Sequence, residues 1–203
     1  MLVTASVADT MAYLTSTDSV KNTFAVGQVE ITLDEALVDG DGKALTGEKA
    51  DRVRANSYKL MPGHEYDKDP TVTVKSGSEA SYIKMEVTVS KIAELDEILE
   101  NHEIEDLTDI VGGYNSDDWI SKGSVDDTSK NTRTYTFYYK STVAAPDADV
   151  ALSALFTSIS VPGEIENDEI ATINDMTITV KAHAIQALGF TDAEDAWSEY
   201  KAS

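Results

Sequence analysis

Stretches in which apolar and polar residues alternate run through the whole chain, and this period of two is typical of β-strands with one buried face. The longest lie at residues 24–33, 71–75, 82–89, 132–142 and 176–186. Because successive side chains of a strand point to opposite faces, each stretch can turn its apolar residues toward a core and its polar residues toward solvent. The pattern therefore predicts a set of half-buried antiparallel strands.

The stretch 132–142 has the strongest strand signal. Tyr135, Phe137 and Tyr139 share one face, and threonines occupy much of the other. Aromatic and β-branched residues are enriched in strands because they pack well on a pleated surface. We therefore expect this strand to lie against the core.

Two other segments give weaker signals. Residues 56–61 predict a short strand, which the Pro-Gly pair after it ends. Residues 150–161 are ambiguous, because their first half has the spacing of a helical turn while 158–161 suits a strand. Turns are predicted at 39–42, where Asp and Gly alternate, and over the polar residues 123–131.

Helical spacing is confined to a few places. Residues 91–102 place apolar side chains three and four apart, and 105–111 extend this pattern into a second short helix. A helical turn is expected within 164–173. Near the C-terminus, Thr191 is followed three residues later by Glu194, a capping box that predicts a short helix carrying Trp197 and Tyr200.

These elements predict a mainly β fold: an antiparallel β-sandwich with short helical insertions at about residues 91–111 and a short C-terminal helix. No Pro-, Gly- or Ser-rich linker divides the sequence. Residues 24–203 are therefore expected to form one sandwich domain.

The first residues follow a different pattern. Thr10 and Ala12 stand three and one positions before a candidate cleavage site, and we interpret residues 1–12 as the end of a signal peptide. Residues 13–23 are a polar connector rich in Ser, Thr and Asp that leads into the first strand. The alternative is an ordinary N-terminal strand or a frayed end.

The charge of the chain limits its partners. It has 37 acidic and 16 basic residues, so its formal net charge is -21. A field of this sign repels nucleic acid and anionic membranes, and we expect neither as a partner of the mature protein. Self-association must overcome the same repulsion, which salt or divalent cations screen. The absence of cysteine excludes disulfides and thiol chemistry.

Three segments carry a family resemblance. Residues 12–18 read Ala-Tyr-Leu-Thr-Ser-Thr-Asp and continue into a strand through Asn22, Phe24 and Gly27. The others are Tyr-Lys-Leu-Met-Pro-Gly at 58–63, followed by Asp69-Pro70, and Ala-Ile-Gln-Ala-Leu-Gly-Phe at 184–190, followed by Ala196-Trp197. In this order they resemble the TasA/CalY (camelysin-like) family, exported by spore-forming Gram-positive bacteria and processed by a dedicated signal peptidase. Residues 92–130 match that family only loosely.

The resemblance implies a jelly-roll-like sandwich that is secreted to the extracellular matrix or cell surface. Proteins of this family form fibres of the biofilm matrix, in which the N-terminal segment of one subunit adds a strand to the next. The implied partners are further copies of this chain, head to tail, and other matrix or minor fibre proteins. Residues 13–23 are then the donor segment, with Tyr13, Leu14, Val20 and Phe24 as its contact residues.

Other readings of the N-terminal segment stay open. Residues 13–23 can instead complete the sheet of their own domain, and the protein is then a monomeric cell-surface binding module. If residues 2–12 are retained, their apolar side chains can act as the donor in place of those in 13–23.

A camelysin-like metalloprotease is a further alternative and requires a zinc site. A zincin places two His four residues apart on a helix, with Glu beside the first. Here Lys68 follows His64 and Glu65 where the second His would stand, and His102 and His183 stand alone. Serine nucleophile elbows and phosphate-binding glycine loops are also missing from the sequence. We therefore expect no enzymatic activity.

No cofactor is expected. Residues 39–43 resemble the start of a calcium loop, but Lys43 occupies the third ligand position, so we interpret them as a hairpin loop. The acidic pairs at 117–118 and 126–127 are interpreted as solvated turns, with weak calcium binding at subunit contacts as the alternative.

Overall fold

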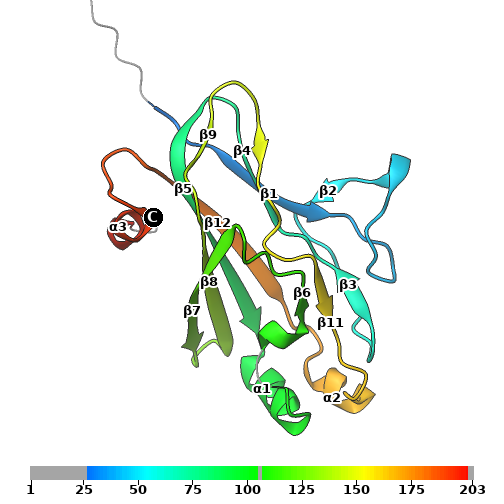
Figure 1. The fold of residues 1–203 in the computed structure, drawn as a ribbon. Helices are drawn as coiled ribbons and strands as arrows, with labels where there is room; N and C mark the ends of the chain where they lie inside the picture. Colours follow the sequence, from blue (N-terminus) through cyan, green and yellow to red (C-terminus); the bar gives the residue numbers. More distant parts are fainter. Residues whose placement is uncertain (1–26, 105–106, 201–203) are drawn as a thin grey trace, which may run out of the picture.

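The computed structural model describes residues 27–104 and 107–200 (Figure 1). The predicted signal-peptide remnant 1–12 and donor segment 13–23 lie outside the described residues, as do Tyr13, Leu14, Val20 and Phe24.

One layer of the fold is a five-stranded antiparallel sheet. Its main path runs β12-β5-β8-β7, and a short strand, β9, pairs with the first residues of β5. The bounds are β5 Ser78–Ser90, β7 Trp119–Asp127, β8 Thr132–Tyr139, β9 Val143–Ala145 and β12 Ile178–Gln186. The central strand β5 is the longest, and buried and half-buried residues alternate in it without interruption from Ser81.

The second layer consists of two smaller antiparallel sheets, β10-β4-β1-β2 and β3-β11-β6. Since β3 precedes β4 and β10 precedes β11 in the chain, the two sheets continue one another (Figure 1). Their bounds are β1 Ile31–Ala36, β2 Arg52–Val53, β3 Glu65–Asp67, β4 Thr71–Val74, β6 Val111–Gly112, β10 Val150–Ala151 and β11 Ser158–Ser160.

The main core lies between the two layers. Val72 and Val74 of β4 pack with Ile83, Met85 and Val87 of β5. Burial of their apolar surface is the main force that joins the layers, at about 25 cal/mol for each Å² removed from water. The predicted fold class is thus confirmed as a mainly β antiparallel sandwich.

Helices α1 and α2 cover one end of the sandwich (Figure 1). Helix α1 (Ile92–Asn101) buries its apolar side chains in a second cluster with Ile165 and Ile173, which flank α2 (Asn167–Thr172). Two 3-10 turns, η1 (Gly47–Lys49) and η2 (Leu107–Ile110), complete the connections.

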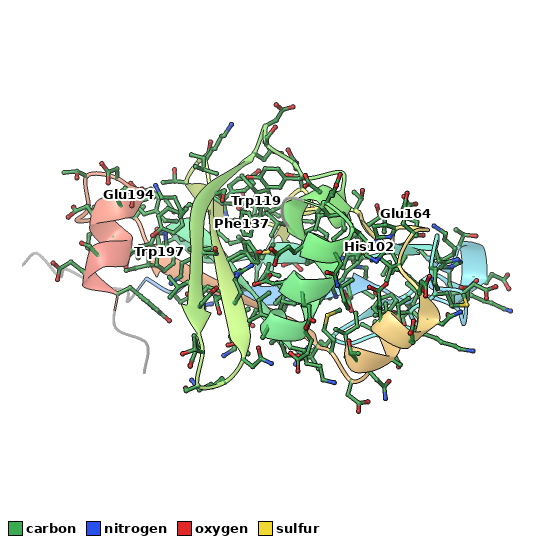
Figure 2. The ribbon with its side chains drawn as sticks, turned by 90° about the horizontal axis from the view of Figure 1, so that it is seen from below. His102, Trp119, Phe137, Glu164, Glu194 and Trp197 are labelled. Carbon is green, nitrogen blue, oxygen red and sulfur yellow. The ribbon has the colours of Figure 1, made fainter. Side chains whose placement is uncertain are left out.

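The C-terminal helix α3 (Ala193–Glu199) lies on the opposite side of the β7–β8 pair from Trp119 and Phe137 (Figure 2). Trp197 of α3 packs on Tyr138, with ring centroids 6.0 Å apart. The helix begins one residue later than predicted. Asp192 is the N-cap and accepts from the Asp195 backbone N–H at 2.9 Å, because its carboxylate reaches the first turn.

The predicted strand at 56–61 is wrong, since these residues pair with no strand in the described part of the chain. The backbone of this segment is hydrogen-bonded to a side chain and not to a neighbouring strand. The hydroxyl of Tyr66 donates to the Lys59 carbonyl at 2.7 Å and accepts from the Met61 N–H at 2.8 Å. The strand of this region is β3, four residues further on.

The predicted polar turn at 123–131 is also wrong in its first half, because β7 continues to Asp127. Polar residues occupy this strand because it lies at the edge of the sheet and most of it is exposed. Other boundaries shift too. Residues 27–30 of the predicted first strand precede β1, which begins at Ile31, and residues 24–26 of that prediction lie outside the described residues. Residues 150–161 form two short strands without a helical turn.

A pair of leucines tests the position of the core. Leu155 is fully buried, whereas Leu188 is 83% exposed. Leu155→Ala is expected to lower the free energy of unfolding by about 2–5 kcal/mol, because it leaves a cavity. Leu188→Ala is the matched control and should change it by less than about 0.5 kcal/mol. Chemical denaturation measures both, and equal losses would contradict this core.

Candidate functional site

The edges of the sheets are the places where this fold can bind another chain. An edge strand carries backbone N–H and C=O groups that its own sheet leaves unpaired. The five-stranded sheet ends in β7 on one side and in β12 on the other, and each strand has nine residues. Their environments differ.

The edge of β7 is closed by the residues just before it. The Trp119 N–H donates to the Asn115 carbonyl at 3.0 Å, and the Tyr114 hydroxyl donates to the Trp119 carbonyl at 3.2 Å. Burial raises the pKa of Tyr114, while a hydrogen bond with the Ser121 backbone opposes that rise. Residues 114–115 thus occupy the groups with which an added strand would pair.

A bulge protects the rest of β7. Its register with β8 shifts between Ser121 and Ser124, and Gly123 there has φ 87°. Charged side chains follow: Asp126 binds Arg133 at 2.7 Å, and Asp127 binds Lys130 at 2.8 Å. Bulges and charges on edge strands are common protections against unwanted pairing.

Strand β12 carries one lysine, Lys181, but no bulge interrupts its pairing. All nine of its residues pair in continuous register with β5. The Ser90 N–H donates to the Thr177 carbonyl, and the Ala187 N–H donates to the Ala80 carbonyl. Because bonded and unbonded pairs alternate, the odd-numbered residues of β12 are the ones that bond to β5. The backbone groups of even-numbered residues such as Val180 and Ala182 therefore point away from the sheet, and no described residue bonds to them.

Strand β1 of the second layer also has an open side, and it faces β12. The Lys75 N–H donates to the Glu30 carbonyl, so even-numbered residues of β1 bond to β4. The backbone groups of Ile31 and Leu33 therefore point away from β4. Strand β2 pairs only with the last two residues of β1. The strands β1 and β12 approach each other, yet they form no ladder within the described residues.

The apolar core is only partly covered along these two strands. Their core-facing side chains pack on the main cluster but are only partly buried: Ile31, Leu33, Ile178, Val180, Ala182 and Ala184. The two alanines on β12 leave room where larger side chains would close the core. We call these six residues and their free backbone groups the β1–β12 seam. It offers both unpaired hydrogen-bonding groups and apolar surface to an added strand.

The metal-ligand candidates from the sequence lie apart. The Nε2 atom of His64 donates to the Asp41 carbonyl at 2.6 Å, His102 contacts Glu169 at 2.7 Å, and His183 contacts Glu86 at 3.2 Å. Among the described residues, no three His, Cys, Asp or Glu side chains are grouped to hold a metal ion.

The acidic segments serve local structure. The Asp39 carboxylate accepts from the N–H groups of Asp41 and Lys43, which makes residues 39–42 the predicted turn. Asp118 accepts from Ser153 and Asn115, and these hydrogen bonds lower its pKa. The pair at 126–127 ends β7, so its interpretation as a solvated turn is corrected.

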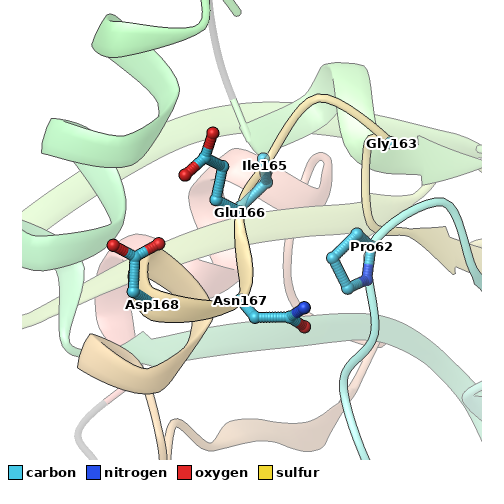
Figure 3. Close-up of a pocket in the computed structure, with 6 residues that line it drawn as sticks. All are labelled: Pro62, Gly163, Ile165, Glu166, Asn167 and Asp168. Atoms are coloured by element: carbon cyan, nitrogen blue, oxygen red, sulfur yellow. The ribbon is translucent and has the colours of Figure 1, made fainter.

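A shallow pocket lies where α2 begins, between Pro62 and Gly163 (Figure 3). Glu166, Asn167 and Asp168 line its other side. The pocket is open to solvent and largely polar, so it lacks the enclosed apolar walls of a typical small-molecule site.

Comparison with protein-family models, with curated proteins and with solved structures found no match. None of the helices in the described residues is long and apolar enough to cross a membrane.

The sequence analysis predicted a donor segment, which stays a prediction, and did not predict the seam. Ala182 and Ala184 are the signal that was available, because small residues at core positions of a strand leave the core uncovered. The seam also depends on which strands are neighbours, and the alternation of residues does not reveal that.

Tyr114 gives a test of the closed edge. Tyr114→Phe removes the hydroxyl that binds Trp119 and Ser121, so hydrogen exchange of the Ser121 amide is expected to rise about fivefold, as for the loss of about 1 kcal/mol. Tyr138→Phe on the neighbouring strand is the control and should leave that amide unchanged. Exchange measured by NMR that is equal in all three proteins would contradict the closure by Tyr114.

Proposed function

We propose that this chain is a secreted structural subunit that assembles into extracellular fibres of a biofilm matrix. In each joint, residues 13–23 of one subunit add as a strand to the β1–β12 seam of the next. The observation that carries the proposal is that one long edge strand, β12, is open over a partly covered apolar core while the other, β7, is closed.

The chemistry of the seam fits an extended peptide. A strand beside β12 can bond to the outward groups of its even-numbered residues, and alternate side chains can cover the seam. About six such hydrogen bonds, each contributing about 1 kcal/mol net, together with apolar burial, can offset the cost of ordering the donor.

One open edge per subunit leads to linear growth. The donor and the acceptor are different surfaces, so the contact is heterologous and propagates unless rotation closes a ring. A closed β7 edge leaves the subunit a single acceptor among the long edge strands described. The predicted product is an unbranched, head-to-tail filament.

The proposal that the protein is secreted is supported by the pattern of its N-terminal residues and by the resemblance to the TasA/CalY family. Within the proposal, residues 1–12 are removed at export and the fibre lies in the extracellular matrix or at the cell surface. Other matrix or minor fibre proteins join the fibre through the same strand addition.

Proline variants test which edge accepts the donor. Ala182→Pro removes an N–H that points out of β12, so it blocks an added strand while the ladder to β5 stays intact. We expect a folded monomer by circular dichroism and no filaments by negative-stain microscopy. Ser121→Pro places the same block on β7 and should still form filaments.

Deletion of residues 13–23 from protein that begins at Tyr13 completes the test and should abolish filaments. Filaments from the deleted protein would exclude this donor, and filaments from a folded Ala182→Pro protein would exclude the seam. A monomer from the undeleted protein would contradict fibre assembly itself.

The charge of -21 predicts how assembly depends on ions. Raising NaCl from 0.1 to 1 M shortens the screening length from about 10 to about 3 Å, so filament growth should accelerate. Since the acidic loops bind no ion specifically in this account, calcium and magnesium at equal concentration should act alike. Light scattering measures the rates, and acceleration by calcium alone would indicate a specific calcium site.

A further inference from the structure

A lysine and a glutamate are buried together beside the C-terminal half of β1. Lys68, in the connection between β3 and β4, is 7% exposed, and Glu35 of β1 is 6% exposed. The Nζ atom of Lys68 donates to Oε2 of Glu35 at 2.5 Å. Removing two charges from water is costly, and transfer of one proton from the ammonium to the carboxylate abolishes both charges. That transfer also produces a neutral amine, which is a nucleophile.

An amide binds the other oxygen of the same carboxylate. The Nδ2 atom of Asn56 donates to Oε1 of Glu35 at 3.1 Å and to the Ala36 carbonyl at 2.8 Å. Its Oδ1 atom accepts from the Val38 backbone N–H at 3.2 Å. The amide is therefore held in place, with its carbonyl polarised and its nitrogen next to an acid.

The surroundings of this group favour neutral species. The ring of Tyr58 lies 5.8 Å from Nζ of Lys68. Burial raises the pKa of Tyr58 to about 12, and the charge of Glu35 adds to this rise. The same enclosure holds Lys68 and Glu35 away from water.

We propose that Lys68 and Asn56 form an intramolecular isopeptide bond, with Glu35 as the acid and base of the reaction. Glu35 accepts a proton from the Lys68 ammonium, and the neutral Nζ attacks Cγ of Asn56. Glu35 passes that proton to Nδ2, the bond between Cγ and Nδ2 breaks, and ammonia leaves. Glu35 then accepts the second proton that Nζ loses and gives it up to the departing ammonia. The products are a secondary amide, an ionised Glu35 and an ammonium ion, so the reaction needs no oxidant, reductant or cofactor.

Each group that the reaction requires is present in a suitable contact. Glu35 bonds to both the nucleophile and the leaving nitrogen, which is the arrangement needed to move a proton between them. The Val38 N–H stabilises the negative charge that develops on Oδ1 during attack. The two nitrogens are thus held next to each other by the two oxygens of one carboxylate.

The bond would close a covalent ring over residues 56–68. This segment has no strand of its own before β3, and Asn56 binds the backbone of β1 and of the loop that follows it. A cross-link would fix the segment to the start of β4 in the unfolded chain as well as in the folded one, which restricts the unfolded state. The inference does not depend on fibre assembly.

Mass spectrometry of the intact, purified full chain tests the proposal. Bond formation is expected to lower the mass by about 17 Da, the mass of ammonia. Trypsin cuts after Arg54 and Lys59 but not after an acylated lysine, so peptides 55–59 and 60–75 should leave as one branched species. A full-length mass equal to that of the unmodified sequence, with free cleavage after Lys68, would overturn the proposal.

Variants separate the cross-link from the ion pair. Lys68→Arg keeps a cation for Glu35 but cannot form the bond, and Glu35→Gln removes the proton carrier; neither should lose mass. Asn56→Asp should lose about 18 Da, because water replaces ammonia as the leaving group. Lys43→Met alters the exposed pair with Asp67 and should keep the loss of ammonia.

Circular dichroism establishes that each variant is folded. A folded Glu35→Gln or Lys68→Arg protein that still loses ammonia would contradict the assigned roles. Loss of water in the unaltered chain would place the bond between Lys68 and Glu35 itself and would overturn the assignment to Asn56.

Discussion

The backbone groups at the edges of a β-sandwich need partners, and this constraint governs how the molecule is built. Within the sheets the ladders satisfy it, and β5 is paired on both sides along its length. At β7, Tyr114 and Asn115 supply the partners from the preceding loop. At the β1–β12 seam no described residue supplies them, and the core-facing side chains there are only partly buried.

Charge and shape act together at this seam. A chain with a net charge of -21 has little tendency toward non-specific association, so a joint must offer directional hydrogen bonds and matched apolar surface. Strand addition offers both. The second charged feature, the buried Lys68 and Glu35, lies near the end of the same strand β1 and acts within one subunit.

Much of the fold was predictable, because β4, β5, β8 and β12 carry a regular alternation and α1 has helical spacing. The errors share a cause: each was decided by a partner outside the segment itself, which the pattern within the segment does not reveal. Residues 56–61 look like a strand, but the Tyr66 side chain binds their backbone. Residues 123–127 look like a turn, but β8 pairs with them. The seam escaped sequence analysis for the same reason, since it depends on β1 and β12, which are about as far apart in the sequence as two strands of this fold can be.

Hydrogen exchange in assembled filaments distinguishes strand addition at β12 from a joint at β7. The outward amides of β12, at Val180, Ala182 and Ala184, have no partner among the described residues of one subunit and should exchange quickly in the monomer. In filaments an added strand would bind them, so the account predicts strong new protection there and little change in β7. Protection that appears along β7 instead, with the β12 amides still exchanging freely, would contradict it.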